Sequence, residues 1–463
     1  TNLPTPTIAD GSDYFDIATY TGDGNSTRTI TNIGFSPDLV WTKARNQAYG
    51  QNWYDIVRTA GKVLRSYLTD AEATNHEHGY LSAFNSDGYT MSAGTTSAKN
   101  GNELNTTYVG WLWDAGSSNT TISAGSLNSS AYNTSGWISS TTVSNLYHSH
   151  NISSVFDGST GTHVHASQGN TLHLQWSSGT IQGRVRLRLR NAGSPGNHQY
   201  KDAGGSAINI SASTTSAWYD LGTVDLTDYY APHPSAGNAA LLEAIELDGK
   251  LLVDTSVTPP NVPAVASTVR ANASAGFSIV SWDYDGTTGQ YTVGHGLNTA
   301  PSMIIVRPRE ITSNWGLYHS ALGNTKGINF NQTNASSAST GWWNNTSPTN
   351  SVFTLSTFFD DNSEYIAYCF APVAGYSAFG SYEGNGSSDG TFVHTGFRIA
   401  WLMIKETSGT DSWLIWDATR QGDNPQGPYL LAEDGQAEVD THYLDFLSNG
   451  FKYRSSHNAM NQS

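Results

Sequence analysis

One short phrase occurs three times in this chain, and a repeated unit constrains a fold more than any single motif does. The phrase reads GFSPDLVWTK at 34–43, GLNTAPSMIIVR at 296–307 and GFRIAWLMIK at 396–405. Each copy starts with glycine and a large apolar residue, continues through an apolar run and ends in Lys or Arg. Longer matches surround the phrase, so we interpret the chain as containing three related copies of one folding unit.

The matches continue on both sides of this phrase. Before it, segments 14–24, 276–286 and 375–386 each read as an alternating strand that ends in a Gly-rich turn. After it, each copy has a strand-like segment with a tryptophan at what we interpret as one repeat position. We expect these tryptophans to lie in the core: Trp53, Trp315 and Trp413.

The last shared element is present in only two copies. TYVGWLWDAG at 107–116 matches EYIAYCFAPV at 364–373, and the third copy has no counterpart before Ser463. An apolar strand cannot be removed from a sheet without exposing the main-chain groups of its neighbours. We therefore expect that the natural polypeptide continues or that another segment fills the gap, and we favour continuation.

The composition predicts an all-β protein. Only 13% of the 463 residues are charged, whereas glycine, tyrosine and tryptophan are abundant, which favours strands and turns over surface helices. A segment of different character, with the hairpin signal Asp248-Gly249, separates the first two copies. We predict four β-sandwich domains in series, of jelly-roll or lectin-like type: copy 1 at 1–116, an inserted candidate glycan-binding module at 117–258, copy 2 at 259–374, and copy 3, truncated at its C-terminus, at 375–463.

The charge balance excludes one class of partner. The formal net charge is −16, and the chain has only 22 lysines and arginines. Binding to phosphates needs clustered cations, so we expect no nucleic-acid partner. No stretch approaches the roughly 20 apolar residues of a membrane helix, so we also expect no membrane insertion.

Several phrases in order resemble one known protein family. GFSPDLVWTK, NWYDIVR, SDGY and YVGWLW follow LPTPTIADGSDYF, and VGHGLNTAPSMIIV, YIAYCFAPVAGYSAFGSYEGNG and DFLSNGFK come later. Together they are similar to the repeat domain of marine bacteriophage tail-fibre and tail-associated proteins. The inserted segment with AIELDGKLLVD is similar to the sandwich that often accompanies that domain. The resemblance implies virion attachment and β-sandwich folds, and it brings no established catalytic or ligand residues.

Histidine is concentrated in one stretch of the inserted module: His148, His150, His163, His165 and His173. Residues i and i+2 of a strand share a face, so His163 and His165 could together bind Zn²⁺, Ni²⁺ or Fe²⁺ through neutral imidazoles. Some phage fibre tips resemble this, with His-x-His pairs from three chains around one ion, and a homotrimer of this chain would complete such a site. The alternative is a polar strand face, or a surface that gains charge in acid.

The sequence VRLRLR at 185–190 places three arginines on one face of a strand: Arg186, Arg188 and Arg190. Their guanidinium groups could bind phosphate or carboxylate on a surface polysaccharide. The simpler interpretation is the solvated outer face of a sandwich, balanced by acids on the next strand.

Exposed aromatic rings and acidic turns are further candidate sites. Trp342 and Trp343 lie in an Asn-rich setting, and because adjacent strand residues face opposite ways we expect one of them to stack on a glycan, together with Trp137. Acidic turns such as 358–365 could hold Ca²⁺, although none has the spaced carboxylates of a calcium loop.

Three functional hypotheses follow. The first is a non-enzymatic, extracellular virion tail protein that attaches to a host-surface glycan or protein and contacts other tail proteins. The second is a polysaccharide depolymerase on the same kind of fibre, a hydrolase or lyase, whose hydrolase form needs two carboxylates about 5 to 9.5 Å apart. The third is a purely structural assembly protein of the virion, with large interfaces to its neighbours.

Overall fold

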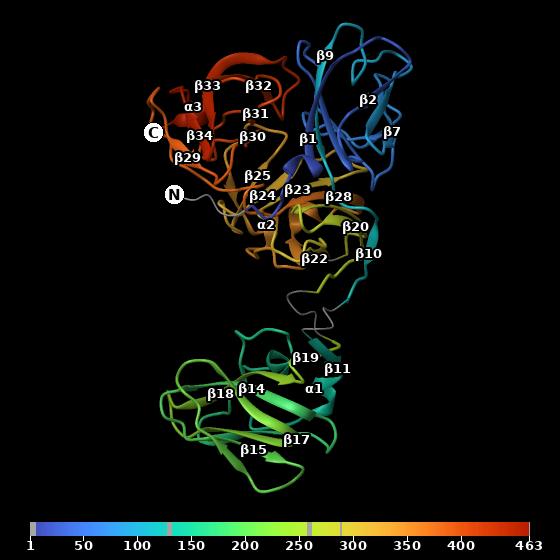
Figure 1. Cartoon of the computed structure of the whole chain (residues 1–463). Helices are drawn as coiled ribbons and strands as arrows, with labels where there is room; N and C mark the ends of the chain where they lie inside the picture. Colours follow the sequence, from blue (N-terminus) through green and yellow to red (C-terminus); the bar gives the residue numbers. More distant parts are fainter. Residues whose placement is uncertain (1–5, 127–131, 257–261, 288, 463) are drawn as a thin grey trace. The chain divides into compact units, whose positions relative to one another are not determined.

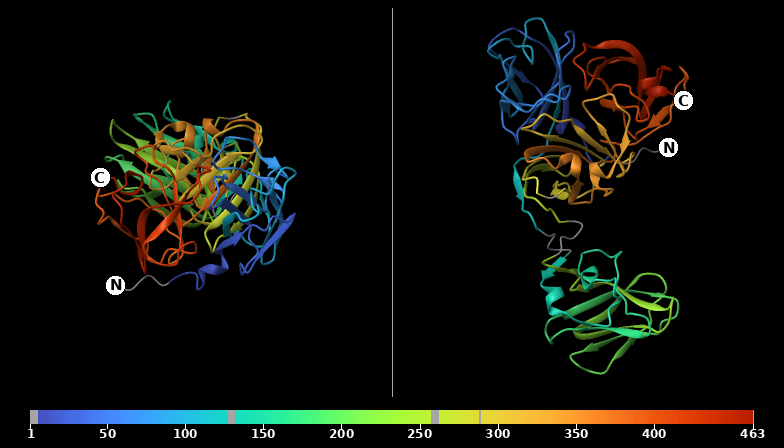
Figure 2. Two further views of the ribbon diagram at one scale, coloured as in Figure 1. Left: turned by 90° about the horizontal axis from the view of Figure 1, so that it is seen from above. Right: turned by 180° about the vertical axis from the view of Figure 1, so that it is seen from behind.

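The computed structural model describes residues 6–126, 132–256, 262–287 and 289–462. Within these ranges the chain is all-β with short helical turns, which confirms the predicted fold class. It forms two compact units (Figures 1 and 2): unit 1 combines Thr1–Ala124 with Pro263–Ser463, and unit 2 is Gly125–Val262. Unit 2 begins later than the predicted boundary at 117, because β10 (Thr120–Ile122) pairs with β20 (Ser267–Asn272) of unit 1.

Copy 1 forms two sheets. Its elements are η1 (Gly11–Asp13), β1 (Phe15–Thr21), β2 (Thr27–Thr31), β3 (Leu39–Ala44), β4 (Asn52–Asp55), β5 (Lys62–Val63), β6 (Ala73–Thr74), β7 (Tyr80–Asn85), β8 (Gly88–Ser92) and β9 (Thr107–Trp113). The larger sheet has the order β1-β9-β3-β4, and the smaller has the order β2-β8-β7; β5 and β6 form a separate short pair.

Copy 2 contains β20, β21 (Phe277–Tyr284), β22 (Tyr291–Gly294), β23 (Met303–Pro308), β24 (Gly316–His319), β25 (Lys326–Asn329), β26 (Ser337–Ala338), α2 (Thr340–Trp343), β27 (Val352–Leu355), η3 (Thr357–Phe359) and β28 (Ser363–Phe370). Its large sheet has the order β10-β20-β21-β28-β23-β24-β25-β26, and β22 pairs with β27.

Copy 3 contains β29 (Phe392–His394), β30 (Trp401–Ile404), β31 (Leu414–Asp417), β32 (Gln426–Leu431), β33 (Val439–Leu447), β34 (Gly450–Tyr453) and α3 (Asn458–Asn461). Its strands form one sheet in the order β29-β34-β33-β32-β31-β30.

The pairing registers define which residues of the copies correspond. β9 lies between β1 and β3, and β28 lies between β21 and β23, in the same antiparallel arrangement. Trp111 of β9 pairs with Trp41 of β3, and Tyr368 of β28 pairs with Ile305 of β23. The two predicted final strands are therefore central strands of their sheets, and Trp111 and Tyr368 occupy corresponding positions.

The predicted match between the core tryptophans is shifted by two residues. By register, the counterpart of Trp53 is Leu317 in copy 2, not Trp315, and Ile415 in copy 3, not Trp413. All three tryptophans nevertheless lie in one core, as expected, because a shift of two residues keeps a side chain on the same face of its strand.

The central strands of unit 1 are buried on both faces, which is why the repeated phrase reads as an apolar run and not as an alternation. In β3, Leu39 and Trp41 point into a core shared by all three copies, while Val40 points into a core inside copy 1. In β28, Tyr368 joins the shared core and Cys369 joins the core of copy 2.

The shared core is rich in aromatic rings from every copy. Trp53 lies 4.3 Å from Trp41 and 5.0 Å from Tyr368 of copy 2 between ring centroids, and Phe330 of copy 2 lies 5.2 Å from Trp413 of copy 3. Both views show the strands of the three copies side by side within unit 1 (Figures 1 and 2). The predicted arrangement of separate domains in series is therefore wrong for the three copies, because their sheets bury a common interior.

An aromatic residue of each final strand reaches an aspartate of another copy. Tyr368 of copy 2 donates its hydroxyl to Asp55 Oδ2 of copy 1 at 2.8 Å. Trp111 of copy 1 donates Nε1–H to Asp417 Oδ2 of copy 3 at 2.9 Å. Asp55 and Asp417 end corresponding strands, β4 and β31, so the two contacts are equivalent.

An ion network closes each of these two contacts. Where copy 2 meets copy 1, Glu72 accepts from Arg58 of its own copy at 3.1 Å and from Arg309 of copy 2 at 3.0 Å. Arg58 also pairs with Asp55. Where copy 1 meets copy 3, corresponding residues repeat the network: Glu438, Arg420, Arg45 and Asp417.

In copies 1 and 2 the Lys or Arg that ends the repeated phrase is buried at a boundary between copies. Lys43 donates to Tyr49 O and, at 2.8 Å, to Gly435 O of copy 3. Arg307 of copy 2 donates to Asp70 O of copy 1 at 2.6 Å. Burial lowers the pKa of Lys43 to about 7 and that of Arg307 to about 10. These side chains give buried main-chain carbonyls the partners that they need.

Copy 3 also contacts copy 2, so that each copy contacts the other two. In the part of the chain that the structure describes, this third contact has no ion network. Ser336 of copy 2 donates through N and Oγ to Thr407 O of copy 3, at 2.9 and 3.0 Å. Trp413 Nε1 donates to Gln332 O of copy 2 at 3.1 Å. Among the described residues, ion pairs join copy 1 to each of the other copies but do not join copies 2 and 3.

The structure corrects the strand predicted at 375–386 in copy 3. The described residues there form turns and irregular backbone, apart from one isolated bridge at Ser377. The physical reason is a missing partner. In copy 1 the corresponding strand, β1, forms its ladder with β9, and copy 3 has no strand in that position among the residues described.

Unit 2 folds around a core of its own. Its elements are β11 (Tyr132–Ser135), α1 (Trp137–Ser140), β12 (Thr142–Ser144), η2 (Ile152–Val155), β13 (Asn170–Gln175), β14 (Gln182–Ala192), β15 (His198–Asp202), β16 (Ile208–Ile210), β17 (Ala217–His233), β18 (Ala239–Leu247) and β19 (Lys250–Asp254). The main strand order is β11-β19-β18-β14-β17-β13-β12, and β15 pairs with β16 and β17.

The predicted hairpin of unit 2 is confirmed. Asp248 and Gly249, with φ of 53° and 79°, join β18 to β19, where Leu247 pairs with Lys250. Positive φ at both central residues is the requirement of a type I′ turn. In the part of the chain that the structure describes, each helix is a single turn, far below the length of a membrane span.

Candidate metal centre

Three histidines of unit 2 come together near its surface. His163 and His165 flank Val164, and His150 comes from the turn before η2. One ring nitrogen from each of the three lies within 4.8 Å of the others, and all three side chains are half-buried. The structure thus brings together the predicted His-x-His pair and one more of the predicted histidines, all from a single chain.

Main-chain bonds hold the two histidine segments against each other. Tyr147 N donates to His165 O at 3.0 Å, and His150 N donates to Tyr147 O at 2.8 Å. The Tyr147 ring stacks on His165, with centroids 4.9 Å apart. Val164 is fully buried, so strand alternation turns its two histidine neighbours away from the core.

The hydrogen bonds leave nitrogen lone pairs at the cluster. His165 Nδ1 donates to Ala166 O at 2.7 Å, so Nε2 keeps its lone pair. A carbonyl on the opposite ring nitrogen is the usual way in which a protein orients a metal-bound imidazole. His150 Nδ1 is buried and has no hydrogen-bond partner. These lone pairs are the kind of donor that a divalent transition-metal cation binds.

The surroundings of two of the three imidazoles favour the neutral form. Burial lowers the pKa of His150, and the nearby His165 and His163 lower it further. Burial also lowers the pKa of His163, and Arg190 and His165 add to that effect. Neutral imidazole is the form that binds metals.

Three nitrogens at this spacing fit a transition metal after a small adjustment. Zn²⁺ binds imidazole nitrogen at about 2.1 Å, which places tetrahedral ligands roughly 3.4 Å apart. The ring nitrogens here lie within 4.8 Å of one another, so modest side-chain rotations close the site. A three-histidine set leaves one coordination position open for water or a ligand oxygen.

Two predicted histidines lie outside the cluster. His148 is exposed, and its ring packs on Tyr147 at a centroid distance of 4.4 Å. His173 of β13 instead places Nε2 at 2.7 Å from Asp228 Oδ1 and stacks on Tyr230. Neither is among the residues that the structure groups as metal ligands.

The sequence patterns missed one neighbour of the cluster. His233 ends β17, and its ring centroid lies 5.1 Å from that of His165. Its Nδ1 donates to Ala166 O at 2.7 Å, the same carbonyl that orients His165. Because β17 lies far along the chain, only the strand pairing brings His233 here, and no local pattern could have predicted it.

The three arginines predicted to bind an anion are already paired. Arg186 bonds to Glu246, and Arg188 and Arg190 bond to Glu243. Both glutamates lie on β18, which neighbours β14. The predicted alternation of inner apolar residues and outer arginines is present, and carboxylates on the next strand neutralise the outer face. The geometry favours the simpler interpretation of this strand.

The three tryptophans considered as glycan contacts are all buried, so the expected exposure of Trp137 and of one of the adjacent pair is wrong. Trp342 and Trp343 lie in α2 with 6% and 1% of their surface exposed. They belong to a helical turn and not to a strand, so adjacent side chains need not face opposite ways, and both reach the core of copy 2. Trp137 of α1 is 5% exposed, and its Nε1 donates to Asn133 O at 2.9 Å.

The predicted calcium turn at 358–365 gathers no ligand set. Among the described residues, the histidine cluster is the single group of three or more close metal-ligating side chains. In that turn the hydroxyl of Tyr365 donates to Asp361 O at 3.1 Å, so a main-chain oxygen is already engaged.

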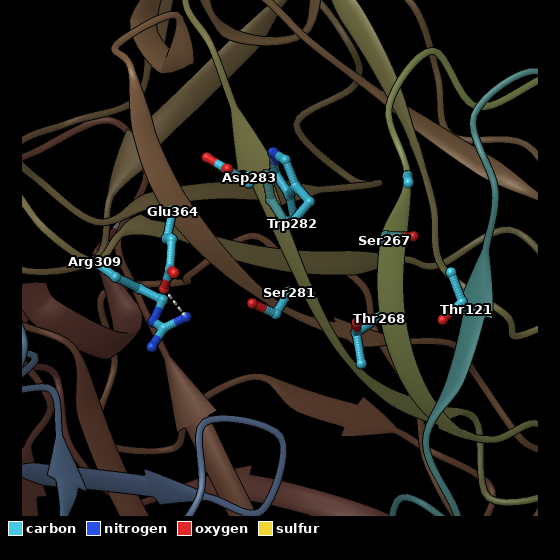
Figure 3. A pocket seen from close by; sticks show the side chains of 9 residues that line it. Thr121, Ser267, Thr268, Ser281, Trp282, Asp283, Arg309 and Glu364 are labelled. Atoms are coloured by element: carbon cyan, nitrogen blue, oxygen red, sulfur yellow. Dashed lines mark ion pairs between the residues drawn. The ribbon is translucent and has the colours of Figure 1, made fainter.

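A shallow pocket lies over β10, β20, β21 and β28 (Figure 3). Hydroxyl side chains and the Arg309–Glu364 ion pair line it. Its volume is about 210 Å³, below the roughly 300–1,000 Å³ of typical small-molecule sites. The Trp282 ring is 3% exposed and stacks on Tyr365, so it offers no free face to a sugar. We assign no ligand to this pocket.

One family model matches most of the chain. It is described as a domain of unknown function, DUF7483, and it matches residues 10–173 and 256–463. The matched ranges include nearly all of unit 1 and the first part of unit 2, with the three clustered histidines. No curated protein matches the chain. The chain belongs to the DUF7483 family.

Proposed function

We propose that the chain is a non-enzymatic attachment protein of a virion tail that works outside the cell. In this proposal unit 1 contacts other tail proteins, and unit 2 is the module that meets a host-surface glycan or protein. The observation that carries it is the histidine cluster on a unit with a core of its own. The resemblance of the repeats to marine bacteriophage tail-fibre proteins supports the role in a virion.

The proposal includes one divalent transition metal at His150, His163 and His165, with Zn²⁺, Ni²⁺ and Fe²⁺ as the candidate ions. Such an ion would join the turn at His150 to the segment at His163, which adds a crosslink to unit 2. Its open coordination position would accept an oxygen of a glycan. A homotrimer remains a proposal, and the single-chain cluster does not require one.

The metal is tested by titrating Zn²⁺, Ni²⁺ and Fe²⁺ into chelator-treated full-length chain. When the free ion is present at a concentration of 100 times its dissociation constant, its binding stabilises the folded protein by about 2.7 kcal/mol. The thermal midpoint of unit 2 should therefore rise. His163→Ala should abolish the rise, whereas His148→Ala, an exposed neighbour outside the cluster, should keep it. An equal response of both variants, or no binding, contradicts the metal proposal.

The attachment role is tested by incubating the chain with envelope polysaccharide from candidate hosts. Tight binding without new reducing ends supports attachment. New reducing ends instead support the depolymerase, which acts on a fibre through paired carboxylates. If neither is seen with any host surface, the purely structural role is favoured. Loss of binding in His163→Ala would assign recognition to unit 2.

A further inference from the structure

An open strand position in copy 3 is the most informative surface feature of unit 1. In copies 1 and 2 a central strand, β9 or β28, lies between two neighbours. In copy 3 the counterparts of those neighbours are β30 and the segment 378–382. Within the described residues no strand lies between them, and β30 pairs only with β31. We call this open position the slot.

Side chains beside the slot are less buried than their counterparts. Trp401, Leu402 and Met403 of β30 are half-buried. The indole nitrogen of Trp401 is buried without a hydrogen-bond partner. The corresponding residues of β3 and β23 are all at most 6% exposed: Leu39, Val40, Trp41, Met303, Ile304 and Ile305. Apolar side chains beside an unpaired strand edge favour the addition of a further strand.

The chain segment that leads toward the slot at Asn461 makes the same hydrogen bonds as the segment that leads into β9 in copy 1. Asn102 lies five residues before β9, and it accepts from Gly24 N at 3.1 Å and, through Oδ1, from Asp23 N at 3.0 Å. Asn461 accepts the corresponding two bonds, at 2.8 and 3.0 Å, from the corresponding residues of copy 3: Gly386 and Asn385. Asn461 therefore marks the end at which a strand enters the slot.

A close backbone approach repeats at the same place. A Cβ atom at Gly22 would lie 2.1 Å from Glu103 O, and a Cβ atom at Gly384 would lie 2.0 Å from Gln462 O. Both distances are too short for any side chain, so glycine is required where the backbone turns toward the slot. The match between Asn102 and Asn461 thus extends to the residues that follow them.

Copy 2, which faces the slot, indicates which residue a strand in the slot should carry at its middle position. In the two complete contacts, Tyr368 and Trp111 each donate to an aspartate of another copy. His319 of copy 2 occupies the aspartate position opposite the slot. Its Nδ1 accepts from Ala321 N at 3.1 Å, so Nε2 carries the proton. A tyrosine hydroxyl can accept from that N–H, whereas a tryptophan indole cannot.

We propose that the slot binds one extended peptide strand, antiparallel to β30, which enters at the Asn461 end. The strand carries the pattern that β9 and β28 share, which is aromatic, aliphatic, small, aromatic, small or aliphatic, aromatic, with the tyrosine of β28 as the middle aromatic residue. It completes the sheet of copy 3 through main-chain bonds to β30 and to 378–382, and it covers Trp401. The proposal does not depend on the proposed function.

The test uses the full chain and a labelled synthetic peptide with the sequence of β28 in which serine replaces Cys369, flanked by lysines for solubility. Saturable one-to-one binding is expected, with new protection of the amides of β30 and 378–382 from hydrogen exchange. A peptide of the same composition, with its residues moved by one position, should bind at least about tenfold more weakly, because its aromatic rings face the wrong side. Replacing the middle tyrosine of the peptide with tryptophan should weaken its binding to the chain about tenfold.

A fusion provides a second measurement. The same strand is appended so that its middle tyrosine lies nine residues after Asn461, as Trp111 lies nine residues after Asn102, and the shifted strand is appended as the control. The thermal midpoint of unit 1 should rise with the first fusion and not with the second. Absence of peptide binding, equal affinity for the shifted peptide, protection elsewhere, or equal midpoints of the two fusions overturns the proposal. Equal affinity for the tryptophan peptide overturns the register opposite His319.

Discussion

Unit 1 and unit 2 are both all-β, but they bury their apolar residues in different ways. In unit 1 the sheets of three copies meet in one core, so the central strands are covered on both faces. In unit 2 the sheets enclose a single core, and β14 alternates buried aliphatic residues with outer arginines. A repeated apolar run therefore indicates a strand between two cores, and a repeat need not be a separate domain.

A shared core has a consequence for stability. The three copies share their interior and should unfold as one cooperative body, whereas unit 2 should unfold by itself.

The largest effect is expected for Trp53→Ala. Trp53 is 1% exposed and packs on rings from copies 1 and 2. Removing a buried indole typically costs about 3–5 kcal/mol, and the whole transition of unit 1 should move while that of unit 2 stays. Calorimetry of the full chain measures both. Phe156→Ala in the core of unit 2 is the matched control and should give the reverse result.

The second-largest loss of stability is expected when the ion networks between copies are broken. Glu72→Gln leaves Arg58 and Arg309 without their shared carboxylate, and Glu438→Gln does the same in the other contact. Breaking a buried pair in this way costs about 3 kcal/mol. Ser336→Ala, in the contact without ions, removes only the hydroxyl bond to Thr407 and should cost less than about 1 kcal/mol. Equal losses from all three variants in urea unfolding would show that the contacts do not differ.

Acid should weaken both units through one buried histidine in each. Burial lowers the pKa of His198 in unit 2 and of His295 in unit 1 to about 4, from an ordinary value of 6.5. The unfolded chain therefore takes up a proton first as pH falls, so stability is full above pH 6.5 and is lost toward pH 4. The expected loss per histidine between pH 7 and pH 5 is about 2 kcal/mol.

Glutamine variants separate the two contributions. His198→Gln should flatten the pH dependence of the unit 2 transition alone, and His295→Gln that of unit 1 alone. Unfolding curves at pH 7 and pH 5 measure this. A slope that persists unchanged in the substituted unit contradicts the assignment to these buried imidazoles.

The smallest effect is expected at the arginine strand. Arg186 pairs with Glu246 on the partly exposed outer face of unit 2 and lies over the Trp218 ring at 5.0 Å. Arg186→Ala should destabilise unit 2 by less than about 1 kcal/mol and leave unit 1 unchanged. If Arg186→Ala instead lowers the free energy of polysaccharide binding by more than it lowers the free energy of unfolding, this face is a glycan contact.

Local patterns predicted much of this structure. The all-β class, the hairpin at Asp248-Gly249 and the central strands around Trp111 and Tyr368 follow from composition, turn chemistry and apolar runs. The open strand position in the described part of copy 3 also follows from the sequence, because segment 107–116 has no counterpart before Ser463. The clustering of His163 with His165 follows from strand alternation.

The remaining features depend on contacts between distant segments. A buried run such as β3 does not reveal whether its second face meets its own sheet or another copy, so the shared core was missed. The acids that pair with Arg186 and Arg188 lie on β18, far along the chain. The expectation that one of Trp342 and Trp343 is exposed assumes a strand, and a single helical turn among strands has no sequence period long enough to detect.

Native-state hydrogen exchange of the full chain across a urea series tests the central claim most directly. We predict that the most protected amides of β9, β28 and β31, one strand from each copy, open with the same free energy and the same dependence on urea, while those of β14 in unit 2 open with their own. Three distinct opening free energies for the three copies would contradict a shared core.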